Sequence, residues 1–163
     1  MKKLLFLTII MQLILLESCK TKELTPEQQE KRDKLTEKIE KPDFLYIPNN
    51  AQPAQGRTIN LDNSFSLKVK NDTIEAYLPY YGRAYTAPID ATNLGIKFTS
   101  TDFEYSSIMK KNGTYDIKIE PKDINNQHLQ GIILYLNVSN SGYGSLNVQS
   151  TNRQNISFYG TLE

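Results

Sequence analysis

Apolar and polar residues alternate with a period of two from residue 43 onward, and this feature limits the possible folds most strongly. In "SFSLKVK" (64–70), Phe65, Leu67 and Val69 alternate with polar residues, and "NISFYGTL" (155–162) alternates in the same way. A period of two is typical of strands that bury one face. Strands of a parallel α/β sheet would be apolar on both faces. The pattern therefore predicts an all-β domain of antiparallel strands.

Turn residues divide this region into about eight or nine short strands. Asn71-Asp72 and Asn112-Gly113 each separate two alternating runs, as in a β-hairpin. Ser139–Gly142 predicts a further turn, after "GIILYLNVS", whose Ile132, Leu134, Leu136 and Val138 would face inward. Because no long amphipathic helix interrupts residues 43–163, we expect an antiparallel meander that forms a sandwich or a small barrel.

The preceding segment, residues 20–42, has a different composition. Thirteen of its 23 residues are charged and none is aromatic. Thr25-Pro26-Glu27-Gln28 predicts a helix start with a capping box, and Pro42 predicts the helix end. Since only Leu24, Leu35 and Ile39 are apolar, we interpret residues 19–42 as a solvated helical tether rather than a partner-binding coiled coil.

The N-terminus predicts a membrane anchor. Lys2 and Lys3 precede an apolar run, residues 4–16, that is shorter than the roughly 20 residues of a membrane span. Leu16-Glu17-Ser18-Cys19 then resembles a bacterial lipobox, although Glu17 departs from the usual small or apolar residue. The resemblance implies a signal peptide at residues 1–18 and fatty acyl chains on Cys19, which stabilise membrane attachment. A buried, unmodified cysteine is the alternative.

The charge of the mature chain argues against nucleic acid as a partner. The 19 basic and 18 acidic side chains become 17 of each when residues 1–18, with Lys2, Lys3 and Glu17, are removed. Nucleic-acid binding requires a concentrated cationic surface. The resemblance to bacterial lipoproteins implies that Lys20, directly after the cysteine, favours the outer membrane with the domain facing the periplasm, and exposure at the cell surface stays open.

The most unusual stretch of the domain is "YLPYYGRAYTAP" (77–88). Tyr80, Tyr81, Arg83 and Tyr85 could hold a sugar or an anionic group, because tyrosine rings stack on ligands and a guanidinium grips carboxylates. Tyr143 and Arg153, from later turns, could join them. The alternative is structural: the tyrosines cover one end of the domain, and an arginine is buried between them.

A family resemblance rests on the blocks "NDTIEAYLPYYGRAYTAP", "GIKF" and "SNSGYGSLNVQSTNRQNISFYGTLE". They resemble the Bacteroidetes-type lipoprotein family called domain of unknown function 4251, over roughly residues 50–163. The resemblance implies a secreted or lipid-anchored β-rich module and carries no catalytic residues.

The sequence contains few candidates for catalytic or metal-binding residues. His128, in "NNQHLQ", is the only histidine, and we expect it to lie exposed in a loop. One histidine and a lipidated cysteine leave too few ligands for zinc, so neither a metal nor another cofactor is expected. Asp102 and Glu104 would lie about 6.6 Å apart on a strand, near glycosidase spacing, but such pairs are common on solvent-facing strands.

These observations predict a lipid-anchored, non-enzymatic β-domain of the cell envelope that binds a ligand, a glycan or a protein partner. Two alternatives stay open. A lipocalin-like carrier of a small apolar ligand would need an enclosed cavity, and a glycan hydrolase would need Asp102 and Glu104 in a cleft.

Overall fold

The computed structural model describes residues 25–85 and 95–163. The chain divides into two compact units, Met1–Glu30 and Lys31–Glu163. Cys19 and the predicted signal peptide lie outside the described residues. Within those two ranges, no helix combines the length and the apolar character needed to cross a bilayer.

Helix α2 (Pro26–Glu40) begins where the sequence predicts. The backbone N–H of Gln28 donates to the Thr25 hydroxyl oxygen at 3.3 Å, and the Thr25 N–H donates to the Gln28 side-chain oxygen at 3.0 Å. These two hydrogen bonds satisfy amide groups that have no partner inside the helix, and they confirm the predicted capping box.

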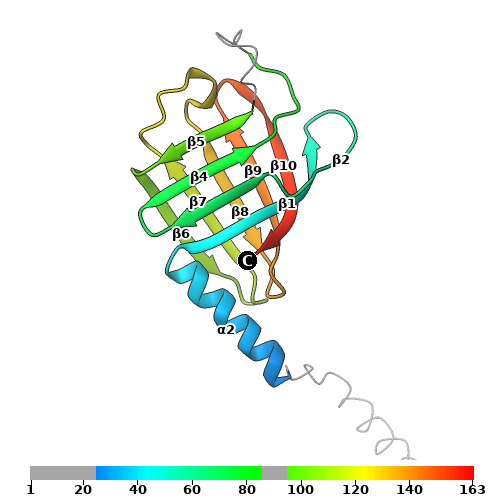
Figure 1. Cartoon of the computed structure of the whole chain (residues 1–163), viewed down its shortest axis with the longest axis vertical. Helices are drawn as coiled ribbons and strands as arrows, with labels where there is room; N and C mark the ends of the chain where they lie inside the picture. The colour runs from blue at the N-terminus through cyan, green and yellow to red at the C-terminus, as the bar shows by residue number, and fades with distance from the viewer. Residues whose placement is uncertain (1–24, 86–94) are drawn as a thin grey trace, which may run out of the picture. The chain divides into compact units, whose positions relative to one another are not determined.

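Ten antiparallel strands form one sheet with the path β5-β4-β3-β1-β10-β9-β8-β7-β6, and β2 pairs with β1 beside it. Apart from the pairing of β1 with β10, neighbours along this path follow one another closely in sequence, so the sheet is a meander nearly closed into a barrel (Figure 1). This confirms the predicted all-β class. The strands are β1 (Asp43–Pro53), β2 (Ile59–Asn60), β3 (Ser66–Lys70), β4 (Thr73–Leu78), β5 (Ile96–Ser100), β6 (Phe103–Met109), β7 (Tyr115–Pro121), β8 (Ile133–Val138), β9 (Tyr143–Ser150) and β10 (Arg153–Leu162).

The inward faces of the strands build the core as the alternation predicts. β7 alternates between buried and half-buried residues along its whole length. Phe65 differs from the prediction, because it lies before β3, is only half-buried and stacks on Tyr77 with ring centroids 5.5 Å apart. Predicted inward residues that are buried include Leu67, Val69, Ile117, Ile119, Ile132, Leu134, Leu136, Val138, Ile156 and Phe158.

The pairing of β1 with β10 depends on a glycine. The register between these strands shifts between Pro48 and Asn50, where β1 contains a bulge. Opposite this bulge, a Cβ atom on Gly160 would lie 2.0 Å from the backbone oxygen of Ile47. Only a residue without a side chain allows this approach, so Gly160 is required for the contact that joins the two ends of the strand sequence.

The second half of helix α2 belongs to the core of the Lys31–Glu163 unit. Leu35 and Ile39 are buried, the Tyr105 hydroxyl donates to the Ile39 carbonyl oxygen at 2.7 Å, and the Tyr115 hydroxyl donates to the Thr36 hydroxyl at 2.9 Å. Residues 31–40 are therefore part of the folded domain, which differs from the solvated tether predicted for all of residues 19–42. Leu35 and Ile39 form only a narrow apolar stripe, but Tyr105 of β6 and Tyr115 of β7 add hydrogen bonds that hold the helix to the sheet.

Candidate functional site

The tyrosine-rich segment after β4 lies beside the start of β10. Ala84 forms an isolated antiparallel bridge with Arg153. The Tyr85 N–H donates to the Asn152 carbonyl oxygen at 2.8 Å, and the Gln154 N–H donates to the Arg83 carbonyl oxygen at 3.0 Å. Residues about 70 positions apart in sequence are thus held together by backbone hydrogen bonds, which fix the conformation of the segment.

Arg153 and Tyr80 form the buried part of this site. Arg153 is only 3% exposed, its guanidinium lies 4.8 Å from the centroid of the Tyr80 ring, and its Nη1 donates to the Gly95 carbonyl oxygen at 3.2 Å. The Tyr80 hydroxyl donates to the carbonyl oxygens of Arg83 and Gln154 at 2.9 and 3.0 Å. Both side chains therefore support the fold in the way that the structural alternative describes.

Burial shifts the pKa values of both Tyr80 and Arg153, because each side chain loses hydration. Loss of hydration raises the pKa of the Tyr80 hydroxyl, because burial disfavours its anionic form. The same loss of hydration lowers the pKa of the Arg153 guanidinium, and the nearby tyrosine opposes that shift. A buried cation that stacks on an aromatic ring is stabilised by the negative face of the ring.

Tyr81, Arg83 and Tyr85 are the exposed part of the site. Tyr81 is 37% exposed and Tyr85 is 66% exposed, and Arg83 is also exposed. In an extended segment, successive side chains point to opposite faces. Arg83 and Tyr85 lie on either side of Ala84, which pairs with Arg153, so their side chains are expected on the same face of this short extended stretch. We call these three residues the aromatic–arginine surface.

Tyr143 does not join this group. It is the first residue of β9 and pairs with Thr161, whereas the other end of β9, Ser150, pairs with Arg153. Tyr143 and Ser150 are seven positions apart on the strand, which corresponds to about 23 Å. The structure therefore brings together five of the six predicted ligand-binding residues and places the sixth at the opposite end of the strand.

His128 is buried, and the expectation of an exposed loop histidine is wrong. It lies in a short 3₁₀ helix, η2 (Gln127–Leu129), and is 7% exposed. Asn126 caps this helix, and the Ser150 hydroxyl donates to the His128 carbonyl oxygen at 3.1 Å. Neither ring nitrogen has a hydrogen-bond partner among residues 25–85 and 95–163. The polar neighbours of His128 in sequence hid its burial, which results from contacts with β9.

The interior of the barrel is filled where the structure describes it. Buried side chains of helix α2 and of most strands form one apolar cluster. A void of about 10 Å³ lies between Tyr80, Leu129 and Arg153, which is room for about one water molecule. This packing gives no support to a lipocalin-like carrier, which would need a cavity of several hundred cubic ångströms.

The carboxylate pair considered for glycan hydrolysis is exposed to solvent. Asp102 and Glu104 are both exposed, and a Glu104 carboxylate oxygen lies 3.3 Å from the Lys122 ammonium. Two exposed acids with a lysine partner are ordinary on the surface of a sheet. In the described part of the chain, no three His, Cys, Asp or Glu residues are grouped as a metal site would require.

The comparisons with known proteins identify a family. The family described as "Domain of unknown function (DUF4251)" matches residues 26–162. A crystal structure of a DUF4251 family protein from Bacteroides eggerthii is similar, with a TM-score of 0.53 and 15% sequence identity over 82% of this chain and 87% of that one. No curated protein matches this chain. At this identity the structural likeness shows the fold alone, whereas the family match covers most of the sequence. The chain belongs to the DUF4251 family.

Proposed function

We propose that this protein is a lipid-anchored β-domain of a bacterial cell envelope that binds a ligand or a protein partner through the aromatic–arginine surface, without catalysing a reaction. Residues 1–19 support the anchor, because an apolar run shorter than a membrane span ends at a lipobox-like Leu16–Cys19. Acyl chains on Cys19 would hold the protein at the outer membrane, facing the periplasm.

The observation that carries the binding proposal is an exposed arginine, Arg83, that lies between two exposed tyrosines in the sequence of a segment held by backbone hydrogen bonds. Backbone hydrogen bonds to Asn152 and Gln154 hold Arg83 and Tyr85 in place before any ligand arrives. A site that is ordered in advance loses less conformational freedom on binding. Tyrosine and arginine are also the residue types most enriched at interfaces.

The chemistry of this surface favours a ligand with a flat or sugar-like face and a carboxylate. Tyr81 and Tyr85 can stack on the former, and the planar Arg83 guanidinium can donate two parallel hydrogen bonds to the latter. Envelope glycans and peptidoglycan peptides combine these features. The buried position of the only histidine gives no support to general-base catalysis at this surface.

The test is the variant Arg83→Ala, compared with Arg57→Ala as a matched control, since Arg57 is an exposed arginine elsewhere in the domain. Binding to immobilised peptidoglycan fragments and envelope glycans would be measured for both variants. We expect at least a tenfold loss of affinity for Arg83→Ala, no change for Arg57→Ala, and an unchanged melting temperature for both. Equal affinity of the two variants for every ligand bound by the wild type would contradict the proposal.

A further inference from the structure

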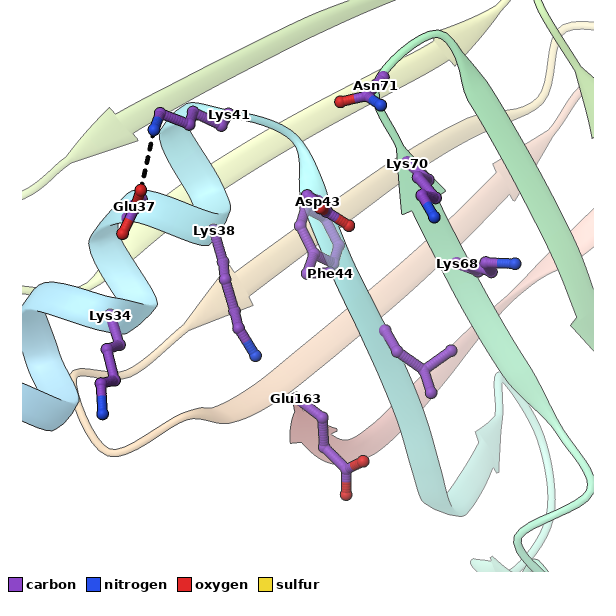
Figure 2. A pocket seen from close by; sticks show the side chains of 11 residues that line it. Lys34, Glu37, Lys38, Lys41, Asp43, Phe44, Lys68, Lys70, Asn71 and Glu163 are labelled. Carbon is purple, nitrogen blue, oxygen red and sulfur yellow. Dashed lines mark hydrogen bonds and ion pairs between the residues drawn. The ribbon is translucent and has the colours of Figure 1, made fainter.

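A second candidate site is lined by residues that do not belong to the aromatic–arginine surface. A pocket of about 570 Å³ opens between helix α2, β1 and β3 (Figure 2). Pockets that bind small molecules have volumes of roughly 300 to 1,000 Å³. Five lysines line it, and we call it the lysine pocket: Lys34, Lys38, Lys41, Lys68 and Lys70.

Four of the five lysines come from two elements, helix α2 and β3, and Lys41 lies in the turn after α2. Lys34 and Lys38 are four residues apart on helix α2, which places them on one helix face. Lys68 and Lys70 are two residues apart on β3, which places them on one sheet face. Figure 2 shows Lys34 and Lys38 on helix α2 and Lys68 and Lys70 on β3, with β1 between the two elements. Like charges in these positions repel, so the arrangement does not serve the stability of the fold.

Acidic residues neutralise only part of this charge. Three carboxylates also line the pocket, and one of them, Glu37, pairs with Lys41 at 2.8 Å. Lys68 has a looser contact with Glu75, at 3.8 Å. Lys38 and Lys70 form no ion pair with any residue that the structure describes.

The remaining acids, Asp43 and Glu163, restrict what the pocket can hold. The lining residues together carry five lysines and three carboxylates, a formal excess of two positive charges, and Glu75 beside Lys68 offsets one of these charges. An excess of this size suits one compact anion better than a long polyanion such as nucleic acid, which requires a wide basic surface. A phosphate group has the charge and the acceptor oxygens to bridge the lysines of α2 and β3.

We propose that the lysine pocket binds a phosphate group, and that the phosphate belongs to an anionic phospholipid headgroup. The choice of source rests on the proposed lipid anchor at Cys19. Lys34 is fifteen residues after Cys19 in sequence, a length of chain that spans at most about 50 Å. Tethering at this length keeps the pocket at a high effective concentration of headgroups. A soluble phosphate monoester offers the same chemistry from another source.

The test compares two double variants of the mature chain from residue 19, both carrying Cys19→Ser so that acyl chains do not contribute. Lys38→Gln/Lys70→Gln alters the pocket, and Lys97→Gln/Lys111→Gln removes the same charge from exposed lysines outside it. Binding is measured by sedimentation with vesicles of phosphatidylglycerol and phosphatidylcholine, and by calorimetry with glycerol phosphate. Circular dichroism melting establishes that each variant is folded.

We expect the pocket variant to bind phosphatidylglycerol vesicles at least tenfold more weakly than the wild type, since each lysine near an anionic surface contributes about a fivefold factor. The control variant should stay within threefold of the wild type. Equal weakening of vesicle binding in both variants would show that binding depends on the general surface charge, and it would overturn the proposal. Failure of the wild type to bind either the vesicles or glycerol phosphate would also overturn it. Binding of glycerol phosphate without binding to vesicles would retain the phosphate site and overturn the lipid source. Because the acyl chain and Arg83 are not involved, failure here is distinct from failure of the proposed function.

Discussion

Arg153→Ala should destabilise the protein, whereas Arg83→Ala should not, although the two arginines lie on adjacent segments. Truncation of Arg153 removes a hydrogen bond from its guanidinium to the Gly95 carbonyl oxygen and a stacking contact at 4.8 Å with Tyr80. A hydrogen bond of a charged group contributes about 1.5–3 kcal/mol, and a desolvated cation–π contact contributes about 1–2 kcal/mol. Relief of the desolvation of the buried cation offsets part of this sum.

The net loss in the free energy of unfolding should be about 2–3 kcal/mol for Arg153→Ala. For a domain of this size, the loss corresponds to a melting temperature lower by about 10 °C. Urea denaturation followed by circular dichroism measures the free energy directly. Arg83→Ala should change it by less than about 0.5 kcal/mol, because the Arg83 side chain is exposed.

Arg153→Lys provides the conservative comparison. A lysine keeps the positive charge but loses the planar group that stacks on Tyr80, so its stability should lie between those of the wild type and Arg153→Ala. If Arg153→Ala had the stability of the wild type, the structural role of this arginine would be refuted. If Arg83→Ala were as unstable as Arg153→Ala, the division of the site into a buried and an exposed part would be wrong.

Three further predictions concern the fold. Ile39→Ala should lower the free energy of unfolding by about 2–5 kcal/mol, because this helix residue is fully buried; a loss below about 1 kcal/mol would return helix α2 to the role of a tether. Gly160→Ala should prevent folding into the native sheet, as measured by near-UV circular dichroism, because its Cβ would overlap the backbone of β1. Hydrogen bonds from Lys118 and Lys122 lower the pKa of Glu120 to about 2, so its contribution to stability is present above about pH 4.5 and lost as the pH falls toward 2. Glu120→Gln should therefore lose less stability than the wild type between pH 5 and pH 2 in urea titrations, and an equal loss would contradict this assignment.

The sequence predicts the parts of the fold that depend on local pattern. Alternation marks the buried faces of β7 and β8, and Thr25 with Gln28 marks the start of the helix, because these signals lie within a few residues of one another. The pairing of β1 with β10 joins strands about 110 residues apart and has no local signal. The same reason explains the burial of Ile39, whose carbonyl oxygen accepts a hydrogen bond from Tyr105 of β6.

The candidate site could be predicted in part for similar reasons. The density of tyrosines near Arg83 predicted a cluster around this arginine, but local sequence could not separate the exposed Arg83 from the buried Arg153. That distinction arises from the bridge between Ala84 and Arg153. The burial of His128 and the lysine pocket likewise come from segments that are distant in sequence and meet only in the folded chain.

Intact mass spectrometry of the protein purified from its native cells tests the proposed attachment by acyl chains. We expect a chain that begins at Cys19, with a mass increased by a thioether-linked diacylglyceryl group. Detection of an unmodified Cys19 thiol, or of the intact residues 1–18, would contradict it.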